Sequence, residues 1–390
     1  MASAFESSAA GSGPLAGVRV IEMAGLGALP FGATKLADMG ADVIRVERPG
    51  DVPADRTPRP HNFWDRGRRS IAVDLKHPEG AAVVLRLAER ADVFLESFRP
   101  GVAERLGIGP QPVLARNPRI VYGRLTGWGQ DGPLAHAAGH ALNYEALTGF
   151  TRSVGSRGGP PVPVLQVVAD FAGGGLHLAY GVVCALLEAR RSGRGQVVDA
   201  AMVDGVMSLL APFYAMHAMG LHTDELGTNL FDGGAPFYAV YETADGRWVS
   251  VAAIEPQFWA QLLAALGIDP ASLPAQHDRA GWPATRERLA AVFRTRTREE
   301  WCARLEGTDA CFAPVLTLGE ARTHPHAVAR GAFVADGERP ELLPSPRLSV
   351  TPGRPRRSPA YPGADTEAVL REVGFDAGEI ERLRAQGAVR

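Results

Sequence analysis

The stretch VRVIEMAGLGALPFGATKLADMGADVIRV, residues 18–46, carries the pattern that decides the fold. The β-branched run at 18–22 predicts a strand, and a glycine-bearing turn at 25–32 follows it. Residues 33–39 have helical apolar spacing, and 41–46 predict a second strand. A strand, a helix and a strand joined by such short turns form a βαβ unit, which requires a parallel sheet with helices on its faces.

The same alternation continues toward the C-terminus. Further strands are predicted at 70–74, 92–96 and 120–125, with helices at 78–90 and around 112–117. A long helix at 171–191 and another strand at 197–201 come next. The fold class that we expect is therefore α/β, with a large doubly wound, Rossmann-like domain.

Beyond residue 201 the alternation of parallel strands and helices is replaced by a different pattern. Residues 202–221 are apolar, methionine-rich and predicted helical, and the runs 237–243 and 247–253 alternate around an Asp-Gly turn, which predicts a hairpin. Helices at 257–266 and 286–304 complete a smaller α+β domain, and two amphipathic helices are predicted at 366–372 and 376–385. We expect four parts: a large domain at 14–200 plus 345–390, a helical linker at 201–229, a small domain at 230–325 and a return linker at 326–344.

The composition limits the possible partners. The chain has 390 residues, of which 46% are apolar, so two domains with sizeable cores are expected. Its 41 basic and 43 acidic side chains give a net charge of -2, and no overall field attracts nucleic acid. No run approaches the roughly 18 apolar residues that span a bilayer, so no membrane insertion is expected. Three scattered cysteines favour a cytoplasmic location, and residues 1–13 are typical of a loose tail.

Two motifs resemble known dinucleotide-binding and zinc-binding motifs only in part. Gly25-Leu26-Gly27 follows a strand as in a dinucleotide fingerprint, but Pro30 replaces the third glycine, so an ordinary turn is favoured over NAD binding. His136 and His140 have the i, i+4 spacing of zinc ligands but lack the accompanying glutamate. We therefore predict no metal site at these histidines, and none at the pair in 324–326.

Two further features leave a functional and a structural interpretation open. Several cations surround predicted strand ends, where ligands bind to open α/β sheets: Arg45, Arg48, Arg66, Arg68, Arg69, Lys76, Arg99 and Arg105. They suit either a polyphosphate ligand or a solvated, arginine-rich surface. Asp170 precedes three glycines at the start of a predicted long helix, where it suits either an N-cap or a site beside an oxyanion.

Taken together, eight short blocks resemble the α-methylacyl-CoA racemases of the class III (CaiB/BaiF-type) CoA-transferase superfamily. The likeness covers the chain from about residue 14 onward and is carried by the blocks at 24–27, 36–43, 99–102, 126–130, 138–140, 169–171, 232–236 and 253–258. The resemblance implies an interlocked homodimer that interconverts R and S 2-methylacyl-CoA thioesters through an enolate. CoA is part of the acyl-CoA substrate, so no separate cofactor is expected.

The resemblance also assigns roles to residues. His140 and Asp170 are implied to be the acid/base pair, and Glu255 is implied to reach His140 from the second subunit. CoA contacts are implied at strand ends and near His140: Arg48, Val73, Asp74, Leu75, Lys76, Ser97, Phe98, Arg99, Arg105, Gly139, Ala141, Asn143 and Tyr144. Methionine side chains are flexible enough to contact acyl chains of different shapes. Four methionines fit either contact with the acyl chain or ordinary helix packing: Met202, Met207, Met216 and Met219.

One position departs from the family pattern and leaves rival functions open. Ala141 follows His140, where the racemases usually carry Asp. A class III CoA-transferase would instead use Asp170 as a nucleophile through an acyl anhydride. The presence of both His140 and Glu255, together with the GGAPFY segment at 233–238, favours proton transfer. A CoA-binding protein without turnover and a nicotinamide oxidoreductase are the remaining alternatives.

Overall fold

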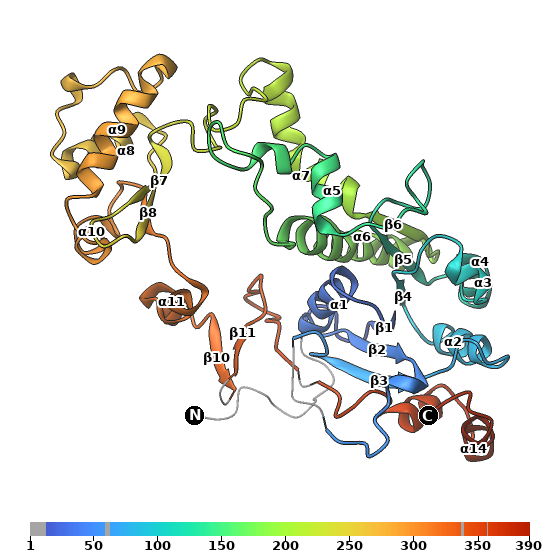
Figure 1. The fold of residues 1–390 in the computed structure, drawn as a ribbon. Coiled ribbons are helices and arrows are strands. Elements are labelled where there is room, and N and C mark those ends of the chain that lie inside the picture. The colour runs from blue at the N-terminus through green and yellow to red at the C-terminus, as the bar shows by residue number, and fades with distance from the viewer. Residues whose placement is uncertain (1–12, 59–62, 337–338, 357) are drawn as a thin grey trace. The chain divides into compact units, whose positions relative to one another are not determined.

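The structure is a computed structural model that describes residues 13–58, 63–336, 339–356 and 358–390. The predicted N-terminal tail lies, up to residue 12, outside the described residues. The chain forms two compact units (Figure 1). Unit 1 comprises Met1–Thr148, Leu165–Leu209 and Phe333–Arg390, and unit 2 comprises Gly149–Val164 and Leu210–Ala332.

Unit 1 is built on a six-stranded sheet in the order β3-β2-β1-β4-β5-β6, with every neighbouring pair parallel. The strands are β1 (Arg19–Met23), β2 (Asp42–Glu47), β3 (Arg68–Ala72), β4 (Val93–Glu96), β5 (Val121–Thr126) and β6 (Val197–Ala201). Apolar runs such as β4 are buried on both faces, as parallel strands between helix layers must be. The predicted doubly wound fold class is confirmed, and the strand order reverses between β1 and β4.

Helices cover both faces of this sheet. They are α1 (Ala28–Asp38), η1 (Pro49–Asp51), α2 (Gly80–Ala88), α3 (Val102–Arg105), α4 (Pro110–Arg116), α5 (Ala141–Leu147), η3 (Val167–Leu176), α6 (His177–Ser192), α13 (Thr366–Glu372) and α14 (Ala377–Ala385). The core on one face joins α1 and α6 to the sheet, and the core on the other joins α2, α13 and α14 to it (Figure 1). The last residues also reach the sheet edge, because Val389 pairs with Val73.

Two helices begin earlier than the sequence predicts. α1 starts at Ala28 rather than at residue 33, because Pro30 lies in its first turn, where a missing N–H costs no hydrogen bond. The long helix predicted from residue 171 starts at Val167, and its first ten residues form a π-helix, η3, a form that often marks functional sites. By length and composition alone, Val167–Ser192 could cross a membrane, and 39% of its most apolar 18-residue stretch is buried within the protein.

Unit 2 contains a small antiparallel sheet in the order β7-β8-β9. Its elements are η2 (Thr151–Ser153), β7 (Tyr238–Glu242), β8 (Trp248–Ala252), α8 (Pro256–Leu266), η4 (Pro270–Ser272), η5 (Arg279–Gly281), α9 (Trp282–Phe293), α10 (Arg298–Leu305), β9 (Phe312–Pro314), α11 (Leu318–Thr323) and α12 (Pro325–Ala329). The predicted hairpin is confirmed as β7 and β8. The single helix predicted at 286–304 is wrong: Thr297 and Glu300 form a capping box that starts α10 after a break.

Two elements fall in segments predicted to be linkers. α7 (Met202–Ala218) lies in the predicted helical linker, and the division between the units falls within this helix. The predicted return linker contains two strands that pair antiparallel, β10 (Phe333–Asp336) and β11 (Arg339–Leu342).

Candidate active site

His140 stands at the N-terminus of α5, with its side chain exposed. Its backbone N–H donates to Oδ1 of Asn143 over 3.0 Å, which fixes the first turn of the helix. The hydroxyl of Tyr144 donates to the Gly139 carbonyl over 2.5 Å, and the Tyr144 ring meets Trp128 edge-on with 4.7 Å between ring centroids. The backbone on both sides of His140 is therefore held in place while the imidazole faces outward.

Asp170 lies in the first turn of η3 and is half-buried. It does not cap the helix, because its N–H already donates to the Gln166 carbonyl over 3.1 Å. Its carboxylate lies against the turn between β1 and α1: a Cβ added to Gly27 would be 3.0 Å from Oδ2. Gly27 is the residue before α1, so the carboxylate is close to a helix N-terminus, whose partial positive charge favours an anion.

The electrostatics of Asp170 connect it to His140. Burial raises the pKa of the Asp170 carboxyl above its usual range, and the nearby His140 offsets part of that rise. A carboxyl whose pKa lies closer to neutral exchanges protons more readily at working pH than an ordinary aspartate does. The structure therefore brings the two predicted acid/base residues into one neighbourhood and gives Asp170 a suitable environment.

Several of the residues predicted to contact CoA lie at the carboxyl ends of three strands of the same sheet. Arg48 directly follows β2, the segment from Val73 to Lys76 follows β3, and the segment from Ser97 to Arg99 follows β4. A Cβ added to Gly25 would lie 2.6 Å from Oγ of Ser97, so the turns after β1 and β4 touch where the strand order reverses. Ligands bind at this crevice in open α/β sheets.

The predicted cluster of cations divides into two groups. Four of its arginines have structural partners: Arg45 and Arg68 pair with the buried Glu22 at 3.2 and 2.9 Å, Arg66 pairs with Asp38 at 2.6 Å, and Arg69 pairs with Asp42 at 2.7 Å. Arg48, Lys76, Arg99 and Arg105 are exposed, and no ion pair involves them within the described part of the chain. Only this second group is available to an anionic ligand.

The remaining predicted residues lie on α7 and in unit 2. Glu255 directly precedes α8 and is exposed, and its side chain does not cap that helix. Met202 packs against η3, since its Cγ lies 3.1 Å from a Cβ added to Gly174. With about 3.6 residues per turn, Met202 and Met216 fall on one side of α7 and Met207 on the other.

Two residues of the site were not assigned to it from the sequence, although one of them belongs to the Gly25-Leu26-Gly27 motif. Gly27 shapes the turn that receives the Asp170 carboxylate, and its φ of 65° is a conformation that favours glycine. Glu145 is fully buried on α5, where its Oε1 accepts the N–H of Ala169 over 3.1 Å. The sequence features that could have indicated these two residues are a glycine in the turn between a strand and a helix, for Gly27, and a single acidic residue within the run YEALTG at 144–149, for Glu145.

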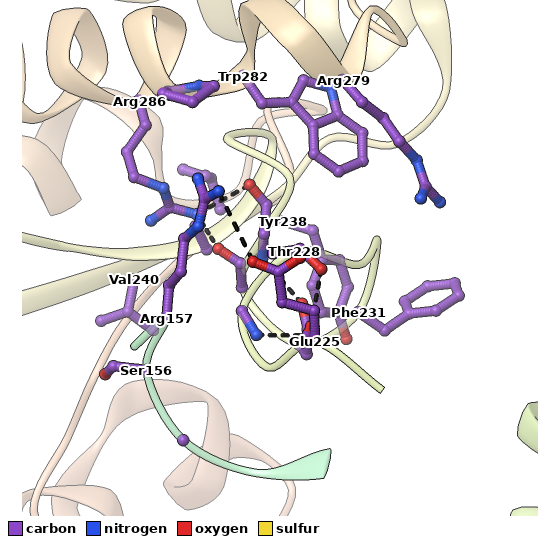
Figure 2. A pocket seen from close by; sticks show the side chains of 18 of the residues that line it. Ser156, Arg157, Glu225, Thr228, Phe231, Tyr238, Val240, Arg279, Trp282 and Arg286 are labelled. Carbon is purple, nitrogen blue, oxygen red and sulfur yellow. Dashed lines mark hydrogen bonds and ion pairs between the residues drawn. The ribbon is translucent and has the colours of Figure 1, made fainter. Parts of the chain in front are cut away.

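A separate pocket of about 1190 Å³ lies wholly in unit 2 (Figure 2). Tyr238 and Val240 from β7 form part of its wall, and Arg157 and Arg286 point into the same region (Figure 2). The guanidinium of Arg286 donates to the Gly233 carbonyl. None of the predicted site residues lines this pocket. Among the described residues, no group of three His, Cys, Asp or Glu side chains could hold a metal ion.

Comparison with known proteins gives one consistent result. The model of CoA-transferase family III matches residues 15–366. The α-methylacyl-CoA racemases of Mus musculus and Homo sapiens are 47% and 44% identical to the chain, over 96% and 95% of it and 97% and 96% of their own lengths. The β subunit of a succinyl-CoA–L-malate CoA-transferase from Chloroflexus aurantiacus is 33% identical over 96% of the chain and 98% of its own length.

Solved structures agree with these relatives. A CaiB/BaiF family protein from Brucella suis matches with a TM-score of 0.77 and 26% identity, covering 93% of this chain and all of that one. A protein from Mycobacterium tuberculosis matches with a TM-score of 0.76 and 28% identity, covering 92% of this chain and 99% of that one. The chain therefore belongs to CoA-transferase family III.

Proposed function

We propose that this protein is a racemase that interconverts the R and S forms of 2-methylacyl-CoA thioesters. The observation that carries the proposal is the 47% and 44% identity, over nearly the whole chain, to two proteins named α-methylacyl-CoA racemase. The proximity of His140 and Asp170 in unit 1 supports it, because inversion of a carbon needs one group to remove the proton and another to return it.

In the proposed mechanism, His140 and Asp170 act on opposite faces of the α-carbon. The basic member of the pair takes the α-proton, the C–H electrons form an enolate with the thioester carbonyl, and the acidic member delivers a proton to the other face. Each positioned group contributes roughly 10²- to 10⁴-fold to the rate. Because the roles reverse with the direction of reaction, the raised pKa of Asp170 favours its use as both acid and base.

The developing enolate oxygen needs a hydrogen-bond donor, and the backbone N–H of Asp170 is the one we propose. In this structure that N–H donates to the Gln166 carbonyl over 3.1 Å. A thioester oxygen would therefore share this donor with Gln166 or displace that carbonyl. This turn belongs to the π-helical η3, a form that is frequent at functional sites.

The CoA moiety is proposed to lie along the carboxyl ends of β2, β3 and β4. The exposed cations there are suited to its phosphates, because Arg48 and Arg99 can each offer two parallel N–H donors. The net charge of -2 gives the protein no general attraction for an anion, so these local contacts must supply the binding energy.

We also propose that two copies of the chain assemble, and that Glu255 contacts His140 of the second copy. Leu176, Tyr180 and Leu187 lie on one face of the long helix and are between 52% and 68% exposed. The opposite face of α6 is part of the core of unit 1, so the exposed stripe is available to a partner. Sedimentation should show a dimer, and Tyr180→Glu combined with Leu187→Glu should yield monomers with little activity. An active wild-type monomer would contradict the assembly.

A CoA-transferase is the second candidate, because relatives with that name are 30–33% identical to the chain. Incubation of one 2-methylacyl-CoA in deuterated water separates the two functions. A racemase incorporates deuterium at the α-carbon without any carboxylic acid acceptor, because the side chain that returns the proton exchanges it with the deuterated solvent. Absence of exchange without an acid acceptor, together with CoA transfer when one is added, would overturn the racemase and support the transferase.

A further inference from the structure

Glu145 is a buried carboxyl that the proposed proton transfer does not use. It lies on α5, five residues after His140, and its side chain is 0% exposed. Carboxyl groups are rarely buried without a cationic partner, because desolvation of the charged form is costly. Among the described residues Glu145 forms no ion pair, and its Oε2 has no hydrogen-bond partner. Such a group needs an explanation other than a salt bridge.

The one side-chain hydrogen bond of Glu145 among the described residues connects the two elements that carry the acid/base pair. Its Oε1 accepts the N–H of Ala169, the residue directly before Asp170, over 3.1 Å. α5, which begins after His140, packs against η3, which contains Asp170. The N–H groups in the first turn of a helix lack carbonyl partners within that helix, so Glu145 supplies an acceptor that the chain near Ala169 does not.

We propose that Glu145 is a positioning residue of the proton-transfer site, whose carboxyl fixes the turn carrying Asp170 relative to the helix that begins at His140. The inference rests on the proposed racemase function. It assigns Glu145 no contact with substrate and no proton transfer. Its role is to maintain the geometry on which the transfer depends, and a misplacement of about 1 Å can cost an enzyme about 10²-fold in rate.

The charges around Glu145 give this role a second, measurable consequence. Burial raises the pKa of the Glu145 carboxyl, the hydrogen bond from Ala169 lowers it, and the charge of Asp170 raises it further. The other titratable residues of α5 and its N-cap are Tyr144 and His140, and Asp170 is the only titratable residue of η3. The charge of Asp170 therefore opposes ionisation of Glu145 and, together with burial, favours the protonated form of this carboxyl.

Two variants separate the geometric from the electrostatic effect. Glu145→Gln keeps an oxygen that can accept the Ala169 N–H but removes the ionisable group. Glu145→Leu has a similar size and removes the acceptor. Thr148→Val is a matched structural control, because the Thr148 hydroxyl donates to the backbone carbonyl of Glu145 at the end of the same helix.

The test measures kcat and KM for α-proton exchange of a 2-methylacyl-CoA in deuterated water, between pH 5 and 9, with melting temperature as a check on folding. We expect Glu145→Leu to lower kcat by about 10- to 100-fold with KM within about twofold. We expect Glu145→Gln to keep most of kcat and to leave the acid limb of the kcat profile near its wild-type position, because the amide oxygen can still accept the Ala169 N–H and the lost carboxyl is favoured in its protonated form. Thr148→Val should lower the melting temperature without changing kcat of the folded protein.

The outcomes distinguish this inference from the function on which it rests. If the wild-type protein exchanges the α-proton and Glu145→Leu exchanges it with the same kcat, the positioning role is wrong while the racemase stands. A loss of kcat in Glu145→Leu no larger than that in Thr148→Val at equal folded fraction would also overturn it. If the wild-type protein shows no exchange, the proposed function itself fails.

Discussion

Replacing Gly27 by alanine tests whether the turn between β1 and α1 positions the Asp170 carboxylate. The new Cβ would lie 3.0 Å from Oδ2 of Asp170, which is closer than nearly all real Cβ contacts, so the carboxylate must shift by a few tenths of an ångström. The backbone at Gly27 has φ 65° and ψ -109°, which costs an L-residue about 1–3 kcal/mol. We expect Gly27→Ala to reduce kcat about tenfold, since the shift is a fraction of the roughly 1 Å that costs about 10²-fold.

The control for this variant is Gly17→Ala. Gly17 also has a positive φ, 82°, but a Cβ there meets no atom within 4 Å, so it imposes backbone strain without crowding the site. Both variants should be measured by α-proton exchange in deuterated water and by thermal unfolding. The reasoning predicts that both lower the melting temperature and that only Gly27→Ala lowers kcat. Equal kcat values for Gly27→Ala, Gly17→Ala and the wild type would refute it.

Three further predictions follow from the charged groups of unit 1. Glu22→Gln leaves the buried Arg68 without its counter-charge, so it should reduce the free energy of unfolding by about 3–5 kcal/mol in a denaturant titration. A loss below about 1 kcal/mol would show that the ion pair contributes little to stability. Because the pKa of Asp170 is raised in the folded state, its ionised form destabilises the fold above the ordinary aspartate pKa of about 3.9. Asp170→Asn should therefore raise the melting temperature at pH 7, and this difference from the wild type should vanish as the pH falls below about 3.9. An equal or lower melting temperature of the variant at pH 7 would contradict this. Arg48→Glu should raise KM for acyl-CoA about tenfold with little change in kcat. The control is Arg116→Glu, which should leave KM unchanged, because Arg116 is an exposed residue that pairs with Glu89. Equal KM values for the two variants would show that Arg48 is not part of the CoA site.

The sheet of unit 1 was predictable because most of its strands are short apolar runs between turn residues, whereas β3 (RRSIA) begins two residues before the strand predicted at 70–74. The alternation of strands and helices in residues 18–46 then implied parallel pairing, and the six parallel strands confirm it. The helix boundaries were less predictable. Pro30 was interpreted as part of a turn, although proline is accommodated in the first turn of α1, and the break before α10 depends on the side chain of Thr297.

The site was only partly predictable for a physical reason. Residues that follow strand ends, such as Arg48 and Ser97, can be located once the sheet is known, because parallel strands end at one edge. The partners of Arg45 and Arg68 could not be located in this way, because Glu22 is distant in sequence and the pairing depends on the register of three strands. The position of Glu145 beside Ala169 depends on how α5 packs on η3, which no local pattern encodes.

The central claim is that His140 and Asp170 form the acid/base pair of a racemase. The most direct test follows the stereochemistry of each pure enantiomer of one 2-methylacyl-CoA with the wild-type protein, His140→Ala and Asp170→Ala, alongside binding of CoA to all three. The account predicts that the wild type converts either enantiomer to the same mixture of both. It also predicts that neither variant racemises the substrate, although both still bind CoA. Racemisation by either variant at the wild-type rate, or no inversion by the wild type, would contradict it.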